Sequence, residues 1–303
     1  MEYILIFLAV ICFAGQFAFT KIYEGTVKQT TASSLIMLTV TGLVGALLFF
    51  IIGGFRISFS PVTVMWAAVF SLIMIPYYTV GIKVLSLGSL AIYSMFMMLG
   101  GMLVPFFYGI LLLDEPISTG KILGTLLLTL FIILQAVSQK DTETTSCQGS
   151  GKSRGVFFTL CILIFFINGM TGVVAKAHQI SVGAADEISF TVISCVLTAV
   201  FGGVILLIMT MRHKNNVIES ARTAMHPKPI LVMVLIGAAA HGGNLLHLMA
   251  AADVPASVQF PIVSGGVMVL SALVSVAGFK EKVTSKEWIC IVGAFLSTVL
   301  FAF

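Results

Sequence analysis

The sequence predicts an all-α membrane protein with ten transmembrane helices arranged as two inverted five-helix repeats. Three observations support this fold class: the apolar composition, the number of long apolar segments, and a recurrence of residues between the two halves of the chain. Of the 303 residues, 59% are hydrophobic and only 9% are charged. Soluble domains carry about 25% charged residues, so this composition excludes a soluble globular protein.

Ten apolar segments are long enough to cross a bilayer, because a helix of about 20 residues spans the hydrocarbon core. The first segment has no basic region before it and no small-residue cleavage site, so it is expected to be a helix and not a signal peptide. The predicted spans are residues 3–20, 33–52, 61–80, 89–112, 118–138, 155–174, 188–210, 229–251, 257–279 and 287–303.

The polar stretch SQKDTETTSCQGSGKSRG is the one low-complexity segment, and its composition is that of a solvated linker. It divides the chain nearly in half. The predicted domains are a first five-helix repeat at 1–138, a polar linker at 139–154 and a second five-helix repeat at 155–303.

Residues recur across this linker. An offset of 155 aligns Lys21 with Lys176, and an offset of 165 aligns the pair Gly100–Gly101 with Gly265–Gly266. Each repeat holds five helices, an odd number, so the second repeat would insert upside down relative to the first. Inverted repeats of this kind suit alternating access around a central site.

The basic residues predict an orientation. Only Arg56, Lys121 and Lys176 of the 16 Lys and Arg lie on one side of the predicted topology, which leaves 13 in or beside the loops after the first, third, fifth, seventh and ninth helices. The positive-inside rule places those loops in the cytoplasm and both termini outside.

Ten helices in a five-plus-five arrangement resemble the drug/metabolite transporter superfamily in its EamA-type form. The residues that carry the resemblance are CFAGQFAFTK in the first helix, LLLDEP after the fourth and KILGTLLL at the start of the fifth. The resemblance implies a central cavity built from the first, third, fourth, sixth, eighth and ninth helices. Members of this superfamily are usually drawn with both termini in the cytoplasm, opposite to the orientation that the charges predict.

The densest group of polar residues inside a predicted span is AHGGNLLH at 240–247. His241, Asn244 and His247 are three residues apart and share one helix face. Polar groups in lipid are costly unless they meet a partner or a water-filled cavity, so these residues are predicted to bind substrate. The alternative is that they only join helices through hydrogen bonds.

Other polar residues are weaker candidates for substrate binding. Gln16 and Asn168 offer amides in the first and sixth helices, and helix packing explains them equally well. Lys21 and Lys176 are predicted to end those helices, either as anion contacts or as anchors that reach the lipid headgroups. Tyr93 could line an aromatic wall.

The remaining predicted residues belong to the second half of the chain and to the glycine pairs. Gln259 falls near the position equivalent to Tyr93. Glycine pairs let helix backbones approach closely or bend, so Gly100, Gly101, Gly265 and Gly266 are predicted packing or hinge residues.

The predicted function is a secondary transporter or facilitator for a small amino acid-, sugar- or nucleoside-like metabolite in the plasma membrane. No catalytic motif, P-loop or metal-ligand spacing occurs, so no enzymatic activity, cofactor or metal is expected. The expected partners are a small-molecule substrate and the lipid bilayer, and no nucleic acid is expected. The sequence is also compatible with a homodimer. A lipid-carrier flippase and a non-transporting scaffold or sensor are the alternatives.

Overall fold

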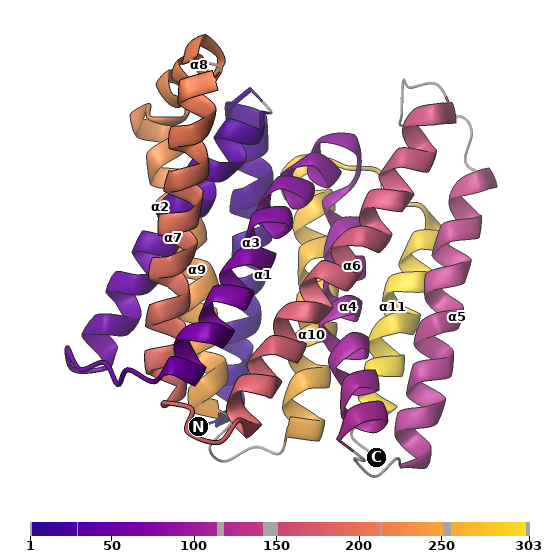
Figure 1. Ribbon diagram of the computed structural model, residues 1–303. Coiled ribbons are helices and arrows are strands. Elements are labelled where there is room, and N and C mark those ends of the chain that lie inside the picture. The colour runs from indigo at the N-terminus through magenta and orange to yellow at the C-terminus, as the bar shows by residue number, and fades with distance from the viewer. Residues whose placement is uncertain are drawn as a thin grey trace. The chain divides into compact units, whose positions relative to one another are not determined.

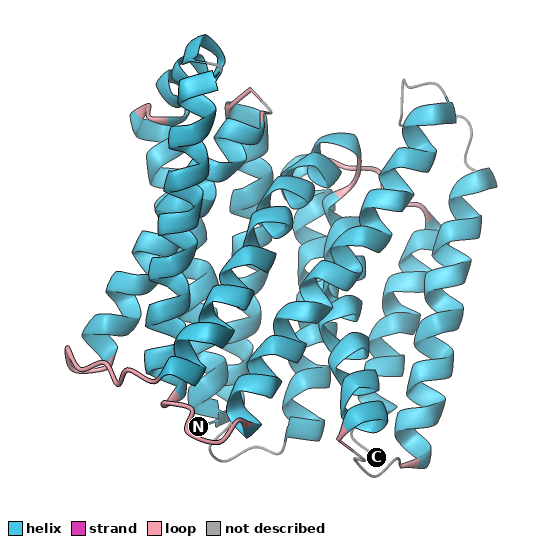
Figure 2. Ribbon diagram, in the orientation of Figure 1, coloured by secondary structure: helices cyan, strands magenta, loops and turns pink. Residues whose placement is uncertain are grey.

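The structure is a computed structural model that describes residues 2–28, 30–113, 118–141, 151–212, 214–250 and 256–300. These residues form eleven helices and no strand (Figures 1 and 2). The helices are α1 Glu2–Thr26, α2 Thr31–Ile52, α3 Pro61–Leu87, α4 Leu90–Leu112, α5 Thr119–Asp141, α6 Gly151–Ile180, α7 Glu187–Arg212, α8 Lys214–Ala224, α9 Pro227–Ala250, α10 Ala256–Phe279 and α11 Ser285–Val299.

Eight helices are long and apolar enough to cross a membrane: α1 to α4, α6, α7, α9 and α10. The chain is therefore a multi-pass, all-helical membrane protein, as its composition predicts. Helix α5 has a shorter apolar run over Thr119–Phe131, and α11 has 15 residues. Ten spans and the inversion of the two repeats stay predictions.

Local sequence sets several helix starts. Thr30 and Ser33 form a capping box at α2, in which each side chain accepts a hydrogen bond from the other residue's backbone N–H. The Thr284 and Glu287 pair repeats this arrangement at α11. Ser89 caps α4 through the Ala91 N–H. These caps satisfy donors that a helix leaves unpaired at its first turn.

The helix ends differ from the sequence prediction in two ways. The basic segment after α7, predicted as a loop, contains the 11-residue helix α8. Helices α1 and α6 also continue past their predicted ends, so Lys21 and Lys176 lie inside helices and do not terminate them. Hydropathy marks where the apolar run stops, whereas a helix continues for as long as its backbone bonds can form.

The chain divides into two compact units, each made of segments from both halves of the sequence. Unit 1 contains 1–18, 87–169 and 242–303, and unit 2 contains 19–86 and 170–241. Helices α1, α6 and α9 each contribute residues to both units.

In unit 1, α10 packs on α4 and α11, and α11 packs on α5. Buried apolar side chains from these helices form one core, which includes Met95, Leu99, Met268 and Ile291. One polar contact crosses it, because the Ser271 hydroxyl donates to the Ser94 hydroxyl at 2.5 Å and both serines are buried.

A second polar joint in unit 1 is a carboxylate at the start of α4. Glu281, in the turn between α10 and α11, accepts hydrogen bonds from the Ser89 hydroxyl at 3.0 Å and the Leu90 N–H at 2.9 Å. The Ser275 hydroxyl of α10 donates to the same oxygen. One carboxylate therefore ties the first turn of α4 to the end of α10.

In unit 2, α2 packs along α7, and the two helices lie side by side (Figure 1). Glycines make this approach close, since a Cβ added to Gly42 would come within 2.9 Å of the Cys195 carbonyl oxygen. A Cβ on Gly202 would come within 2.6 Å of the Thr39 hydroxyl. Small residues that admit a neighbouring backbone are typical of membrane helix pairs.

Candidate functional site

The three polar residues of AHGGNLLH all lie within α9. His241 and His247 are half-buried and Asn244 is exposed. His241 is the last residue of unit 2, and the other two belong to unit 1. Their surroundings are therefore described separately.

His241 is held between α9, α2 and α7. Its ring nitrogens lie 3.9 and 4.0 Å from the Cys195 thiol, and its ring meets Phe49 edge-to-face at a centroid distance of 6.1 Å. A side chain on Gly45 would overlap the imidazole ring. The ring thus fills the space that glycine leaves on α2.

Further polar groups surround this histidine. The Thr41 hydroxyl lies 3.0 Å from the Tyr78 hydroxyl, and a Cβ added to Gly237 of α9 would come within 3.3 Å of the Thr41 Cα. Four helices thus contribute uncharged polar groups to what we call the His241 cluster: Thr41 of α2, Tyr78 of α3, Cys195 of α7 and His241 of α9.

The chemistry of the His241 cluster is hydrogen bonding without permanent charge. Hydroxyl and imidazole groups both donate and accept, so the cluster suits ligands that carry hydroxyl, amide or zwitterionic groups. Among the described residues, no three His, Cys, Asp or Glu side chains come close enough together to hold a metal ion.

In unit 1, Asn168 of α6, a predicted substrate-binding residue, is hydrogen-bonded to the backbone of α4. The Asn168 side-chain N–H donates to the Met97 carbonyl oxygen at 2.6 Å, and Asn168 lies over Gly101. Tyr93 is 3% exposed and packs edge-to-face on Phe17 at 5.6 Å. These contacts give Asn168 and Tyr93 structural partners inside unit 1.

The lysine of α1 has a role that the sequence did not indicate. The Lys21 ammonium donates to the Leu85 carbonyl oxygen at 2.7 Å. Leu85 lies in the last turn of α3, where carbonyl groups have no partner within the helix. Lys21 therefore caps α3, a role that its position in the sequence could not reveal because α3 is far away along the chain.

The other predicted residues are placed as follows. Gln16 in α1 and Lys176 in α6 are half-buried. Position 259 is part of α10, and the side chain of Gln259 lies outside the described residues.

The glycine pairs lie at close helix contacts. Side chains on Gly100 and Gly169 would each collide with the other helix of the α4–α6 pair. A Cβ on Gly265 would come within 2.7 Å of the Thr298 hydroxyl of α11, and one on Gly266 would lie 3.1 Å from Val10 of α1.

Sequence reasoning missed a polar joint at the turn between α6 and α7. His178, in the last turn of α6, is only 1% exposed and lies 3.1 Å from the Thr63 hydroxyl of α3. Its ring stacks on Phe190 at 4.2 Å, and its Nδ1 has no hydrogen-bond partner among the described residues. Thr63 also accepts from the Ala185 N–H at 2.7 Å. The partners come from three elements, so no local pattern could have indicated them.

Next to this joint, Asp186 caps the first turn of α7. Its carboxylate accepts from the Ser189 N–H at 2.9 Å and from the Ser189 hydroxyl at 2.8 Å. Burial tends to raise the pKa of Asp186, but these hydrogen bonds to the charged form outweigh it and hold the pKa below its ordinary value.

We expect the cap at α7 to weaken in acid. A lowered folded-state pKa means that the stabilisation is complete above the ordinary value of about 3.9 and is lost as pH falls through the folded pKa. The melting temperature of Asp186→Asn should therefore lie below that of the wild type at pH 6, and the gap should narrow towards pH 3. A constant gap across this range would show that ionisation of Asp186 contributes nothing.

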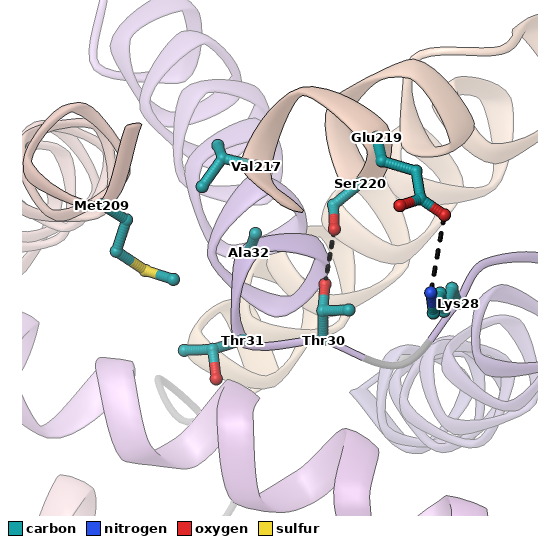
Figure 3. Close-up of a pocket in the computed structure, with 8 residues that line it drawn as sticks. All are labelled: Lys28, Thr30, Thr31, Ala32, Met209, Val217, Glu219 and Ser220. Atoms are coloured by element: carbon teal, nitrogen blue, oxygen red, sulfur yellow. Dashed lines mark hydrogen bonds and ion pairs between the residues drawn. The ribbon is translucent and has the colours of Figure 1, made fainter. Parts of the chain in front are cut away.

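A surface pocket of about 380 Å³ lies at the other end of unit 2, between the start of α2, the end of α7 and α8 (Figure 3). The Thr30 and Ser220 hydroxyls lie 2.9 Å apart across it, and the Lys28 ammonium lies 3.4 Å from the Glu219 carboxylate. None of the predicted substrate-binding residues lines this pocket.

No protein-family model and no curated protein matches the chain. A solved structure with the uninformative name "Crystal structure of protein" aligns with a TM-score of 0.51 and 13% identity. The alignment covers 99% of this chain and 96% of that chain. At this identity, the likeness shows a shared fold and nothing about activity.

Proposed function

We propose that the protein is an EamA-type secondary transporter or facilitator that carries a small uncharged or zwitterionic metabolite across the plasma membrane. The observation that carries this proposal is the His241 cluster, in which four apolar, membrane-length helices contribute uncharged polar groups to one place. Polar groups within membrane helices are costly unless they meet a partner or a water-filled cavity, so they are candidates for a substrate pathway.

Helix pairing supports the ten-span, two-repeat design on which the proposal rests. The linker divides the helices into α1 to α5 before it and α6, α7, α9, α10 and α11 after it. Three close pairs, α2–α7, α4–α10 and α5–α11, join helices of the same rank in the two halves, while the pair α10–α11 joins consecutive helices of one half. A two-fold relation between the repeats produces pairs of this kind, and alternating access uses that relation.

The direct test begins with ligand identification. The purified protein is melted with amino acids, sugars and nucleosides, because a ligand that binds the folded state raises the melting temperature. A labelled form of the ligand giving the largest shift is then offered to proteoliposomes. Uptake above that of empty vesicles supports transport. Movement of labelled lipid without solute uptake would favour a flippase.

His241→Leu should lower uptake of that ligand about tenfold, the effect of losing one hydrogen bond worth about 1.4 kcal/mol. His241→Gln should retain more activity because the amide also donates and accepts. Ser71→Ala is the matched control, since it removes a buried hydroxyl of α3 that bonds only to backbone carbonyls. If His241→Leu, Asn244→Leu and His247→Leu all show normal uptake at equal expression, these α9 residues join helices and do not bind substrate.

A further inference from the structure

Helix α8 has a buried face that fixes it to unit 2. Val217, Ser220 and Ala224 are 6%, 3% and 0% exposed, and they lie three and four residues apart, which places them on one side of the helix. This side packs on α2 and α7. Ala224 joins a core that also contains Tyr23 and Met233. The helix is therefore docked and its orientation about its own axis is set.

The opposite face of α8 combines apolar and basic side chains. Ile218 is 49% exposed, Arg222 is exposed, and Met225, in the turn that ends the helix, is 56% exposed. At about 100° per residue, Arg222 lies about 40° and Met225 about 20° from the direction of Ile218, so all three point the same way. Apolar side chains on an exposed face of an amphipathic helix are typical of helices that lie at the membrane surface.

Further basic residues flank α8 in the sequence. Arg212 precedes α8, Lys228 follows it, and both are exposed like Arg222. The one acidic residue of the helix, Glu219, already pairs with Lys28 (Figure 3). Arg212, Arg222 and Lys228 thus face the surroundings with no acidic residue of α8 left to balance them. We call Arg212, Ile218, Arg222, Met225 and Lys228 the α8 surface.

We infer that the α8 surface binds the acidic phospholipid headgroups of the leaflet that meets this end of the protein. Ile218 and Met225 enter the boundary between headgroups and acyl chains, while the arginines and the lysine bind lipid phosphates. The argument for this occupant is charge complementarity together with position, because α8 directly follows the membrane-spanning helix α7. Juxtamembrane basic residues are attracted to anionic lipid, and the attraction is screened by salt.

A fluorescent label at the surface tests this inference. Met225→Cys carrying an environment-sensitive nitrobenzoxadiazole group is reconstituted into vesicles of phosphatidylcholine alone or with about one third phosphatidylglycerol. The expected result is a blue-shifted emission and slower dithionite quenching in the mixed vesicles. The difference should shrink at high salt.

Two further variants make the test specific. Arg212→Gln with Arg222→Gln in the labelled protein should abolish the dependence on phosphatidylglycerol. Lys83→Gln, which removes an exposed lysine near the end of α3 without touching α8, should leave it intact. A label that stays equally accessible to water in both vesicles would overturn the inference and leave the surface to a protein partner. A shift that survives loss of both arginines would overturn it as well.

Discussion

Gly100→Ala is expected to destabilise the protein by about 3 kcal/mol or more, the upper end of the cost of overpacking. The added methyl group would overlap the Phe165 carbonyl oxygen, which belongs to the backbone of α6 and cannot move aside as a side chain could. The helices α4 and α6 would have to separate, which would also strain the hydrogen bond from Asn168 to Met97. Thermal unfolding in detergent, followed by size-exclusion chromatography, measures the effect.

Gly203→Ala in α7 is the matched control for this prediction. Nothing lies within 4 Å of a Cβ added there, so the better helix propensity of alanine should leave stability unchanged or raise it by up to about 1 kcal/mol. Equal melting temperatures for the two variants would mean that α4 and α6 are not in close contact at Gly100.

Glu281→Ala is expected to be the second most damaging substitution, with a loss of about 2–4 kcal/mol. Hydrogen bonds to a charged group contribute about 1.5–3 kcal/mol each, and their effects in one cluster do not add fully. The carboxylate accepts from Ser89, Leu90 and Ser275, and its removal leaves the first turn of α4 without that acceptor. The melting temperature of the protein should fall accordingly.

Two variants bracket the Glu281 prediction. Glu281→Gln keeps an acceptor oxygen and should retain most of the stability. Glu219→Ala removes an exposed carboxylate whose ion pair with Lys28 spans 3.4 Å, and such surface pairs contribute about 0–1 kcal/mol. If Glu281→Ala were no worse than Glu219→Ala, Glu281 would not hold the two elements together.

Composition and hydropathy were sufficient to predict an all-helical membrane protein, whereas the ten spans and the inverted repeats stay predictions. The apolar run from Thr31 to Ile52 and that from Leu90 to Leu112 were predicted within two residues at each end, because a bilayer sets the length of an apolar helix. Helix α8 was missed because the prediction searched for long apolar segments and most residues of α8 are polar. Its buried side can be recognised only from the tertiary structure, where α8 packs on α2 and α7.

For the candidate site as well, local features could be predicted from the sequence and tertiary contacts could not. The spacing of His241, Asn244 and His247 correctly predicted one helix, since that spacing is local. Neither Gly45, which makes room for the imidazole, nor Cys195 and Phe49, which border it, could be found without the tertiary structure.

The segment order of the two units has a consequence for biosynthesis. Unit 2 has all its residues once the ribosome has added His241, whereas unit 1 also needs 242–303, which are made after them. During translation, α4 and α5 therefore lack their packing partners until α10 and α11 have been synthesised. Early release of the nascent chain after α9 would leave unit 2 intact in sequence. The same product would expose the faces of α4 and α5 to chaperones and to quality-control proteases.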